Sequence, residues 1–479
     1  MKWPWSSQAC ATSDIDLHSI IVSAMLVIVS VHCCSANTIS AGQDIQSAIT
    51  RAIPGDTIIV DPGNYAPFEI DKPLSIKANG AIIRAGVQKA GLIISSDNVS
   101  VSGFSIHGVG EDSTAKFTYY MNHPLTAATK LDLPNAAIIV NGNGFSLSNT
   151  TIFGAEVGVY AYSVSGMGLM NSTLEGCKTG IELQKCYDGR VENCTVSNCD
   201  KAGLDLENCR NFALKNNTAE KIIHMGMMLK GSRQCEVWDN LFSGNIEGLS
   251  LWNSSFIDVR RNRADHNYYG ILVAGSDNNT LTENLAENNS RSEIVEGFGV
   301  GISLQDNSSF NVVAKNAANR NFNGLEVTRG CKVNAIYGNN ATDNVHGIRM
   351  DKCRNNIIYG NDFVRNKINA YENSSHNIWN TTFGNFYSDY RGEDYNRDGI
   401  GDTPYDLPGG DSDSADSKPL MHPFVPSTID MKGLRAEASR IANYFPEEEL
   451  PYKKIDGVIL IRSNKPVAPP KWPQSKPLF

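Results

Sequence analysis

A glycine that precedes a short run of alternating apolar residues recurs at a nearly constant interval from residue 158 onward. It stands at Gly158, Gly180, Gly203, Gly226, Gly248, Gly270, Gly301, Gly324 and Gly347, and Ala370 takes the next place. The successive spacings are 22, 23, 23, 22, 22, 31, 23, 23 and 23 residues. The long step contains an extra stretch, 290–299, which indicates a loop insertion. A fixed period of this length is typical of a solenoid, in which each coil stacks on the one before.

The residues one and three places after each glycine are apolar, as at Ile181 and Leu183. Apolarity at every second residue buries one face of a strand. An asparagine follows about fourteen residues after most of the glycines, at Asn193, Asn217, Asn240, Asn262, Asn284, Asn316, Asn339 and Asn361. A further asparagine often comes five residues later, as at Asn198 and Asn245. Asparagine tolerates the left-handed backbone of tight turns, and it can hydrogen-bond along a stack of its own kind. These features predict an all-β protein, a right-handed parallel β-helix with coils of about 22–23 residues.

The start of the repeat region carries a family resemblance. The stretches DIQSAI (44–49), PGDTIIV (54–60) and PGNY (62–65) resemble the opening of NosD-type β-helix proteins, which belong to the wider carbohydrate-binding and sugar-hydrolase (CASH) class. The resemblance covers roughly residues 37–425, and it implies an N-terminal helical cap, a first coil and export. It says little about activity, because one fold hosts many functions. The class includes lyases, hydrolases, epimerases, metal-linked periplasmic proteins and inert surface proteins.

Four segments are expected. Residues 1–36 resemble a signal peptide, since the apolar run 20–31 is too short to span a bilayer and small residues precede Asn37. Residues 37–385 form the β-helix, with a lateral insertion at 111–134. Residues 386–425 form an acidic segment, and residues 426–479, with an expected helix at 430–444, form an appendage of open role. After signal cleavage we expect no transmembrane anchor, and a protein that is secreted, at the cell surface or in a periplasmic-equivalent space.

The net charge of −9 and the pI near 5.5 argue against nucleic acid as a partner, because phosphate binding needs a basic face. Twelve N-x-S/T sequons fit a glycosylated surface protein, although an asparagine-rich repeat also generates them by chance. We expect the partner to be a carbohydrate or an envelope polymer.

Three carboxylates fall on outward positions of two adjacent coils. Neighbouring coils lie about 4.8 Å apart, and alternate residues of a strand about 6.5–7 Å apart, so Glu182, Asp205 and Glu207 should form one exposed cluster. Carboxylates at such distances are what acid–base cleavage of a glycosidic bond needs, and their repulsion raises one pKa. Tyr160, Tyr162, Lys230 and Trp252 flank the cluster as candidate substrate-binding residues. The alternative is a solvated strand face whose charges discourage edge association.

The segment after the last coil contains a calcium-loop pattern. Asp394, Asn396, Asp398, Ile400 (through its carbonyl) and Asp402 occupy ligand positions 1, 3, 5, 7 and 9, with Gly399 at position 6. Position 12 departs from the pattern, because Tyr405 replaces the usual glutamate. The motif resembles the D-x-N-x-D-G-x-G-D-T-P-Y ending of archaeal surface β-helix repeats. It predicts calcium in a structural role; an Asp/Asn/Gly turn cluster is the alternative.

NosD proteins are associated with copper-site assembly, so the resemblance also raises copper. The local candidates are His224, Met225, Met227 and Met228, with His346 and Met350 elsewhere. Met227 and Met350 fall on inward columns, where core packing explains them. We therefore expect calcium rather than copper.

Two further patterns leave their alternatives open. Asp265-His266 resembles the acid–base pair of alginate-modifying β-helix enzymes but lacks their Asp-Pro-His signature, which favours a turn pair. Cys177 and Cys199, Cys186 and Cys209, and Cys331 and Cys353 lie one coil apart, within reach of disulfides, or they are buried free thiols.

Three functions remain. The first is a calcium-stabilised surface protein that binds carbohydrate or forms part of the envelope. The second is a polysaccharide hydrolase or lyase that uses Glu182, Asp205 and Glu207. The third is a NosD-like copper-linked periplasmic protein. The sequence leaves open whether the chain is an enzyme at all.

Overall fold

The computed structural model describes residues 36–85, 90–108, 117–121, 129–133, 135–289, 299–373, 375–408, 414–424, 452–455 and 458–461. Of residues 117–121, 129–133, 452–455 and 458–461 only the backbone is described. Nearly all of the expected signal peptide, the loop insertion 290–299, most of the lateral insertion and the expected helix at 430–444 lie outside the described residues. In the described part of the chain, no helix is long and apolar enough to cross a membrane.

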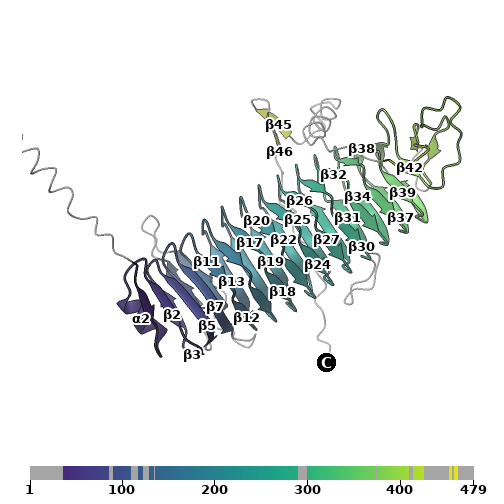
Figure 1. Cartoon of the computed structure of the whole chain (residues 1–479). Coiled ribbons are helices and arrows are strands. Elements are labelled where there is room, and N and C mark those ends of the chain that lie inside the picture. The colour runs from purple at the N-terminus through teal and green to yellow at the C-terminus, as the bar shows by residue number, and fades with distance from the viewer. Residues whose placement is uncertain are drawn as a thin grey trace, which may run out of the picture. The chain divides into compact units, whose positions relative to one another are not determined.

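The predicted parallel β-helix is confirmed (Figure 1). From Val157 on, each coil contains a six-residue strand, which starts one residue before the repeat glycine where the coil has one, and two further strands, which are shorter except for the six-residue strand Arg354–Tyr359. The first strands pair in parallel into a 13-stranded sheet, called sheet 1 below. Its strands are β4 (Phe68–Ile70), β6 (Leu92–Ile94), β10 (Ala136–Val140), β13 (Val157–Tyr162), β16 (Thr179–Gln184), β19 (Ala202–Glu207), β22 (Met225–Lys230), β25 (Glu247–Trp252), β28 (Tyr269–Ala274), β31 (Val300–Gln305), β34 (Asn323–Thr328), β37 (His346–Asp351) and β40 (Ile368–Asn373).

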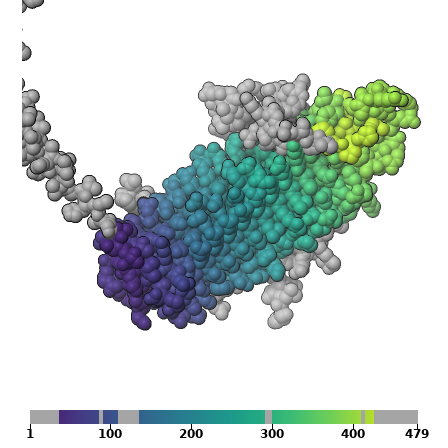
Figure 2. All heavy atoms as spheres, viewed as in Figure 1, coloured from purple at the N-terminus to yellow at the C-terminus, as the bar shows by residue number. Residues whose placement is uncertain are grey.

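The other two strands of each coil belong to a 27-stranded parallel sheet, called sheet 2. One row contains β11 (Ser146–Ser148), β14 (Gly168–Met170), β17 (Arg190–Glu192), β20 (Ala213–Lys215), β23 (Glu236–Trp238), β26 (Asp258–Arg260), β29 (Thr280–Thr282), β32 (Val312–Ala314), β35 (Ala335–Tyr337), β38 (Arg354–Tyr359) and β41 (His376–Ile378). The next row contains β12 (Thr151–Phe153), β15 (Thr173–Glu175), β18 (Thr195–Ser197), β21 (Thr218–Glu220), β24 (Leu241–Ser243), β27 (Arg263–Asp265), β30 (Leu285–Glu287), β33 (Ala317–Asn319), β36 (Asn340–Thr342), β39 (Asp362–Val364) and β42 (Phe386–Tyr387). The side chains of consecutive coils lie directly against one another (Figure 2).

A short helix closes the N-terminal end, as the family resemblance implied. Helix α2 (Ile45–Arg51) begins after Asp44, whose carboxylate accepts a hydrogen bond from the Gln46 amide at 3.0 Å and so satisfies a free helix amide. The helix buries Ile45, Ala48 and Ile49 against the first coils. Those coils are built from β1 (Thr38–Ser40), β2 (Thr57–Val60), β3 (Gly63–Tyr65), β5 (Ser75–Arg84) and β7 (Ser100–His107).

Three antiparallel hairpins lie apart from the two sheets in the described chain. The lateral insertion contains β8 (Phe117–Met121) and β9 (Thr129–Leu133), and the acidic segment contains β43 (Tyr405–Asp406) and β44 (Ala415–Asp416). The appendage contains β45 (Tyr452–Ile455) and β46 (Val458–Ile461).

The repeat glycine is required by the close approach of neighbouring coils. A Cβ atom on Gly226 would lie 2.5 Å from the carbonyl oxygen of Gly248 and 2.8 Å from the side-chain amide of Asn245. The same clash with the next coil recurs from Gly158 to Gly347. A side chain at this position would therefore push the coils apart, which explains the strict period.

The asparagines form buried ladders inside the coil. Asn262 donates its backbone amide to the side-chain oxygen of Asn284 at 3.0 Å, and it donates its side-chain amide to the same oxygen at 3.0 Å and to the carbonyl of Val237 at 2.8 Å. Each asparagine of this column therefore joins three consecutive coils. The column runs through Asn217, Asn240, Asn262, Asn284, Asn316, Asn339, Asn361 and Asn385.

Two more asparagine columns run parallel to it, one from Asn245 to Asn366 and one from Asn279 to Asn377. The column from Asn217 to Asn385 ends on Asp416, whose buried carboxylate accepts a hydrogen bond from the backbone amide of Asn385 at 2.7 Å. The acidic segment thus terminates a ladder of the coil.

The left-handed turn positions differ from the prediction by one residue in most coils. The backbone φ is positive at Asn216, Asp239, Arg261 and Glu283, each directly before a ladder asparagine. Asn193 and Asn198 themselves are left-handed, so their neighbours Cys194 and Cys199 hold the inward ladder positions. Asparagine is chosen here for its stacking amide, and the turn accepts several residue types.

Replacing a mid-column asparagine should destabilise the protein strongly. In Asn262→Ala, the buried amides of Asn240 lose their acceptor and the Val237 carbonyl loses a donor. Buried groups left unpaired cost about 1–3 kcal/mol each, so we expect a loss of roughly 3–5 kcal/mol in the free energy of unfolding, measured by chemical denaturation. Asn64→Ala, at an exposed position of β3, is the control. Equal effects of the two substitutions would contradict the ladder's role.

Candidate functional site

The structure brings the predicted carboxylates together on the outer face of sheet 1, but the cluster is less exposed than predicted, since Asp205 is buried. Glu182 of β16 pairs in register with Asp205 of β19, and Gln184 pairs with Glu207. The next strand places Lys230 beside Glu207. The fixed coil length made this adjacency predictable.

Two of the three carboxylates are neutralised by lysines. The Lys201 ammonium lies 2.9 Å from Asp205, and the Lys230 ammonium lies 3.0 Å from Glu207. Glu182 instead accepts a hydrogen bond from the Gln184 side-chain amide at 2.8 Å. The sequence prediction missed Lys201, because this residue precedes the strand and does not belong to its outward columns.

The three carboxylates therefore differ in electrostatic environment. Burial raises the pKa of Glu182; the nearby Lys201 charge opposes this shift and the Asp205 charge adds to it. A carboxyl group with a raised pKa beside a second carboxyl group is one arrangement that acid–base chemistry on a glycosidic bond uses.

The predicted aromatic residues are less accessible than expected. Tyr160 is 3% exposed and Trp252 is 8% exposed, and Trp252 packs against Leu272 and Ala274. Tyr162 is half-buried, and its hydroxyl accepts a hydrogen bond from Lys185 at 2.7 Å. Of these three rings, only that of Tyr162 presents much surface to solvent. Sugar stacking stays a prediction for Tyr162, whereas Tyr160 and Trp252 offer little ring surface for it.

A groove lies on sheet 2, on the same coils as the acidic cluster. Its volume is about 820 Å³, and it crosses β11, β14, β17, β20 and β23. One wall consists of turn residues with left-handed backbone, including Asp188, Asn211 and Gln234. The other consists of strand residues, including Arg190, Glu192 and Glu236.

The groove exists because its floor lacks side chains. Gly168 and Ala213 stand where neighbouring coils carry larger residues, namely Ser146, Arg190 and Glu236. Three carboxylates line it against one guanidinium, so its charge is negative. The sequence prediction missed the groove, since it searched for reactive side chains; the small residues at these outward positions were the available signal.

A second polar network covers the outer face of β31, β34 and β37. Glu326 is 8% exposed, and its carboxylate accepts from Asn323 at 2.6 Å and lies 3.6 Å from Arg349. His346 contacts the side-chain oxygen of Asn323 at 2.9 Å, and burial lowers the pKa of this histidine. The network is closed on itself, because each of these charged groups has a partner within it. Glu326 and Arg349 lay in the outward columns of the sequence, but the link from Glu326 through Asn323 to His346 was not predicted.

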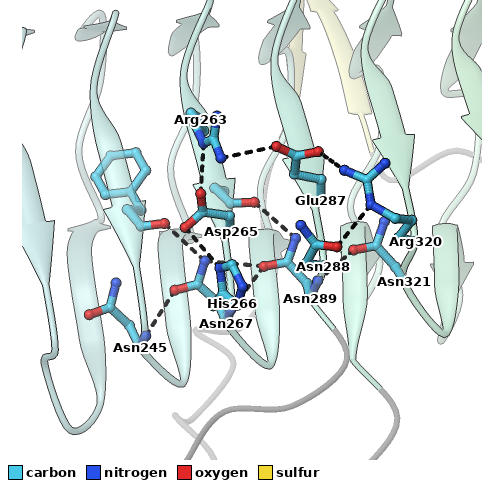
Figure 3. Close-up of polar contacts among 12 residues, drawn as sticks. Asn245, Arg263, Asp265, His266, Asn267, Glu287, Asn288, Asn289, Arg320 and Asn321 are labelled. Atoms are coloured by element: carbon cyan, nitrogen blue, oxygen red, sulfur yellow. Dashed lines mark hydrogen bonds and ion pairs between the residues drawn. The ribbon is translucent and has the colours of Figure 1, made fainter.

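Asp265 and His266 belong to an ion-pair network on β27 and β30 (Figure 3). Arg263 donates to Asp265 at 2.6 Å and lies 3.1 Å from Glu287, which also pairs with Arg320. The His266 ring lies 3.4 Å from Asp265, and its side chain is 63% exposed. Burial alone would raise the pKa of Asp265, but the Ser243 and Arg263 hydrogen bonds lower it below the ordinary value. The guanidinium groups of Arg263 and Arg320 form ion pairs with the carboxylates of this network, which favours a structural role for Asp265 and His266.

The calcium-loop residues form a turn that is closed by its own side chains. Asp394 accepts from the Gly399 amide at 2.9 Å, and Asp398 accepts from the Ile400 amide at 2.8 Å. Asp402 accepts from the Tyr395 amide at 2.6 Å. Tyr405, at the twelfth position, stacks on Tyr387 with ring centroids 3.8 Å apart, so it belongs to the core.

In the described part of the chain, no three His, Cys, Asp or Glu side chains form a metal cluster. Met227 and Met350 are fully buried in the core, as expected. His224 and His346 lie on coils far apart in the stack.

Comparison with known proteins agrees with the fold. The family described as "Periplasmic copper-binding protein (NosD)" matches residues 52–247, 120–297 and 238–392. The "Probable ABC transporter binding protein NosD" of Stutzerimonas stutzeri is 25% identical over 371 residues, which are 76% of this chain and 77% of that protein.

Solved structures show the same architecture at low identity. The Dettilon tailspike protein superposes with a TM-score of 0.50 at 14% identity, over 64% of this chain and 67% of its own. The A-module of the Azotobacter vinelandii mannuronan C-5 epimerase AlgE6 gives a TM-score of 0.42 at 12% identity, over 72% and 94%. Similarity at this level shows the fold alone. Since the family match extends over residues 52–392, most of the chain, this protein belongs to the NosD family of periplasmic β-helix proteins.

Proposed function

We propose that this chain is an exported β-helix protein that binds a carbohydrate polymer in the groove on sheet 2 and is stabilised by calcium. The groove itself carries the proposal. Its volume of about 820 Å³ falls in the range of ligand sites, commonly about 300–1,000 Å³. Its walls offer amide and carboxylate groups such as Asn211, Gln234 and Glu236, which both donate to and accept from sugar hydroxyls.

The groove favours a particular class of polymer. It crosses successive coils about 4.8 Å apart, so the same kinds of group repeat along it at about the length of a sugar residue. Its excess of carboxylates over its one guanidinium, Arg190, repels polyuronates. We therefore infer a neutral or amino-sugar polysaccharide as the ligand.

Calcium is proposed for the loop from Asp394 to Asp402. The side-chain oxygens of Asp394 and Asn396, at positions 1 and 3 of the pattern, both accept from the Asp398 amide, and that of Asp398, at position 5, accepts from the Ile400 amide. The loop lacks a carboxylate at its twelfth position, so the affinity should resemble that of weak extracellular sites.

Cleavage of the polymer is the second candidate function, and the environment of Glu182 favours it. Its raised pKa would let it donate a proton to a leaving oxygen, while the Asp205 carboxylate is held in place by its ion pair with Lys201. Soluble reducing ends that the wild type releases and Glu182→Gln does not, with binding unchanged, would support this function.

Filling the groove should weaken binding. A side chain at Gly168 has room on the backbone, since its Cβ would meet only the Arg190 side chain, at 3.4–3.7 Å. We expect Gly168→Gln to weaken binding on an array of neutral, amino-sugar and uronate polymers by about tenfold or more, because one or two hydrogen bonds of about 1 kcal/mol each are lost. Thr173→Gln, on β15 of the same coil, should bind normally. A folded, calcium-responsive protein that binds no glycan would contradict the proposal and favour an architectural envelope role.

Calcium should bind with a dissociation constant on the order of 10⁻⁴–10⁻³ M in calorimetry. Asp398→Ala removes one ligand and should eliminate the signal. Asp61→Ala, outside the loop, should leave it intact. Retention of binding in Asp398→Ala would rule out this loop as the calcium site.

Glu182 should make stability depend on pH. Because its pKa in the folded protein lies above the ordinary 4.5, it stabilises the fold at acid pH, and this contribution is lost as pH rises through the raised pKa. Glu182→Gln should therefore gain unfolding free energy relative to the wild type at pH 8, and less or none at pH 4. The measurement is urea denaturation at both values; the same difference at both would show that Glu182 titrates normally.

A further inference from the structure

Four cysteines occupy the places where two inward columns reach the earlier coils. The column that begins with Asn245 is preceded by Ile222, Cys199 and Cys177, each one coil earlier. A column of serines that includes Ser232 and Ser254 is preceded by Cys209 and Cys186. Thiols therefore replace the amides and hydroxyls that link the later coils.

Strand register places the thiols in pairs. Glu175 pairs with Ser197, two residues before Cys177 and Cys199. Gln184 pairs with Glu207, two residues before Cys186 and Cys209. The spacing of about 4.8 Å between coils lies inside the 4.4–6.8 Å window of Cα separations that disulfides require.

The register therefore sets the two thiols of each pair side by side on adjacent coils. All four cysteines are free thiols and at most 1% exposed. A hydrogen bond from Cys199 lowers the pKa of Cys177, and one from Cys209 lowers that of Cys186. Each pair thus faces its partner in a space closed to solvent.

Between Cys177 and Cys199, and between Cys186 and Cys209, the two columns have no side-chain amide or hydroxyl that links one coil to the next. A thiol is a weak donor and acceptor, so a thiol column binds neighbouring coils less tightly than an amide column does. The family is periplasmic, and disulfides form and persist in that compartment.

We propose that Cys177–Cys199 and Cys186–Cys209 are joined as disulfides in the exported protein. Each bond forms as two thiols lose two protons and two electrons to a disulfide oxidant, which is reduced to two thiols. Since the sulfurs are buried, the bonds form before the coil closes. They tie together the coils that carry Glu182, Asp205 and the groove.

The other four described cysteines stay reduced. Cys194 stacks between Ser172 and Asn217, and Cys235 stacks between Phe212 and Ile257, so neither has a thiol neighbour. Cys353 lies in register with Cys331, but its sulfur contacts the Ser375 hydroxyl at 3.7 Å and the Asn377 amide at 3.5 Å. These residues serve as internal controls.

The test is differential alkylation of the full chain, exported to an oxidising compartment and denatured without reductant, followed by peptide mass spectrometry. The expected result is linked peptides for the two proposed pairs, each 2 Da lighter than the sum of its thiol peptides, and alkylated Cys194, Cys235, Cys331 and Cys353. Alkylation of all eight would overturn the proposal. So would a different pairing.

Stability gives a second, independent measurement. Reductant should lower the thermal midpoint of the exported wild type, because opening a cross-link frees the unfolded chain. A variant with Cys199→Ser and Cys209→Ser should not respond to reductant, whereas Cys194→Ser should respond like the wild type. An identical midpoint of the wild type with and without reductant would also count against the disulfides. Neither measurement depends on carbohydrate binding.

Discussion

The hydrogen bond from one asparagine side chain to the next is the interaction on which this coil depends. A solenoid must turn its chain sharply inside a dry interior, where the backbone groups at each corner lose their water. An unpaired buried amide costs free energy, so each corner needs a partner from the protein. Asn262 supplies donors and an acceptor at once, to the coils before and after it. The repeat glycine then lets those coils approach closely enough for the ladder to form.

Fixing the interior in this way leaves the outer columns free to carry function. Outward residues on adjacent coils are held at one spacing, so charges can be set beside one another without any special loop. Glu182 and Asp205 are neighbours for this reason, and so are Glu207 and Lys230. The groove on sheet 2 depends on the same coil spacing, but it arises from small residues. Gly168 and Ala213 leave a hollow while the backbone of the strands continues beneath it.

The sequence predicted the features that follow from the coil period and the strand register. It failed where a contact with a further residue determines the result. The fold, the inward columns and the adjacency of the three carboxylates followed from a constant coil length. The burial of Tyr160 and Trp252 did not, since strand alternation fixes the direction of a side chain and not what covers it. Asn193 and Asn198 were placed one residue off, because asparagine suits both a left-handed turn and a ladder. Only the structure separates these two roles.

Membership of the NosD family therefore constrains the frame of this protein more than its ligand. The family match extends over the coils, whose inner ladders demand particular residues. The outer columns carry no such demand, and among the described residues no three His, Cys, Asp or Glu side chains form a metal cluster. What they do bring together is a negatively charged groove and a lysine-bridged acidic cluster on opposite sheets of the same coils. A protein that keeps its axial links in its interior can change the chemistry of its surface, one outward residue at a time, without changing its fold.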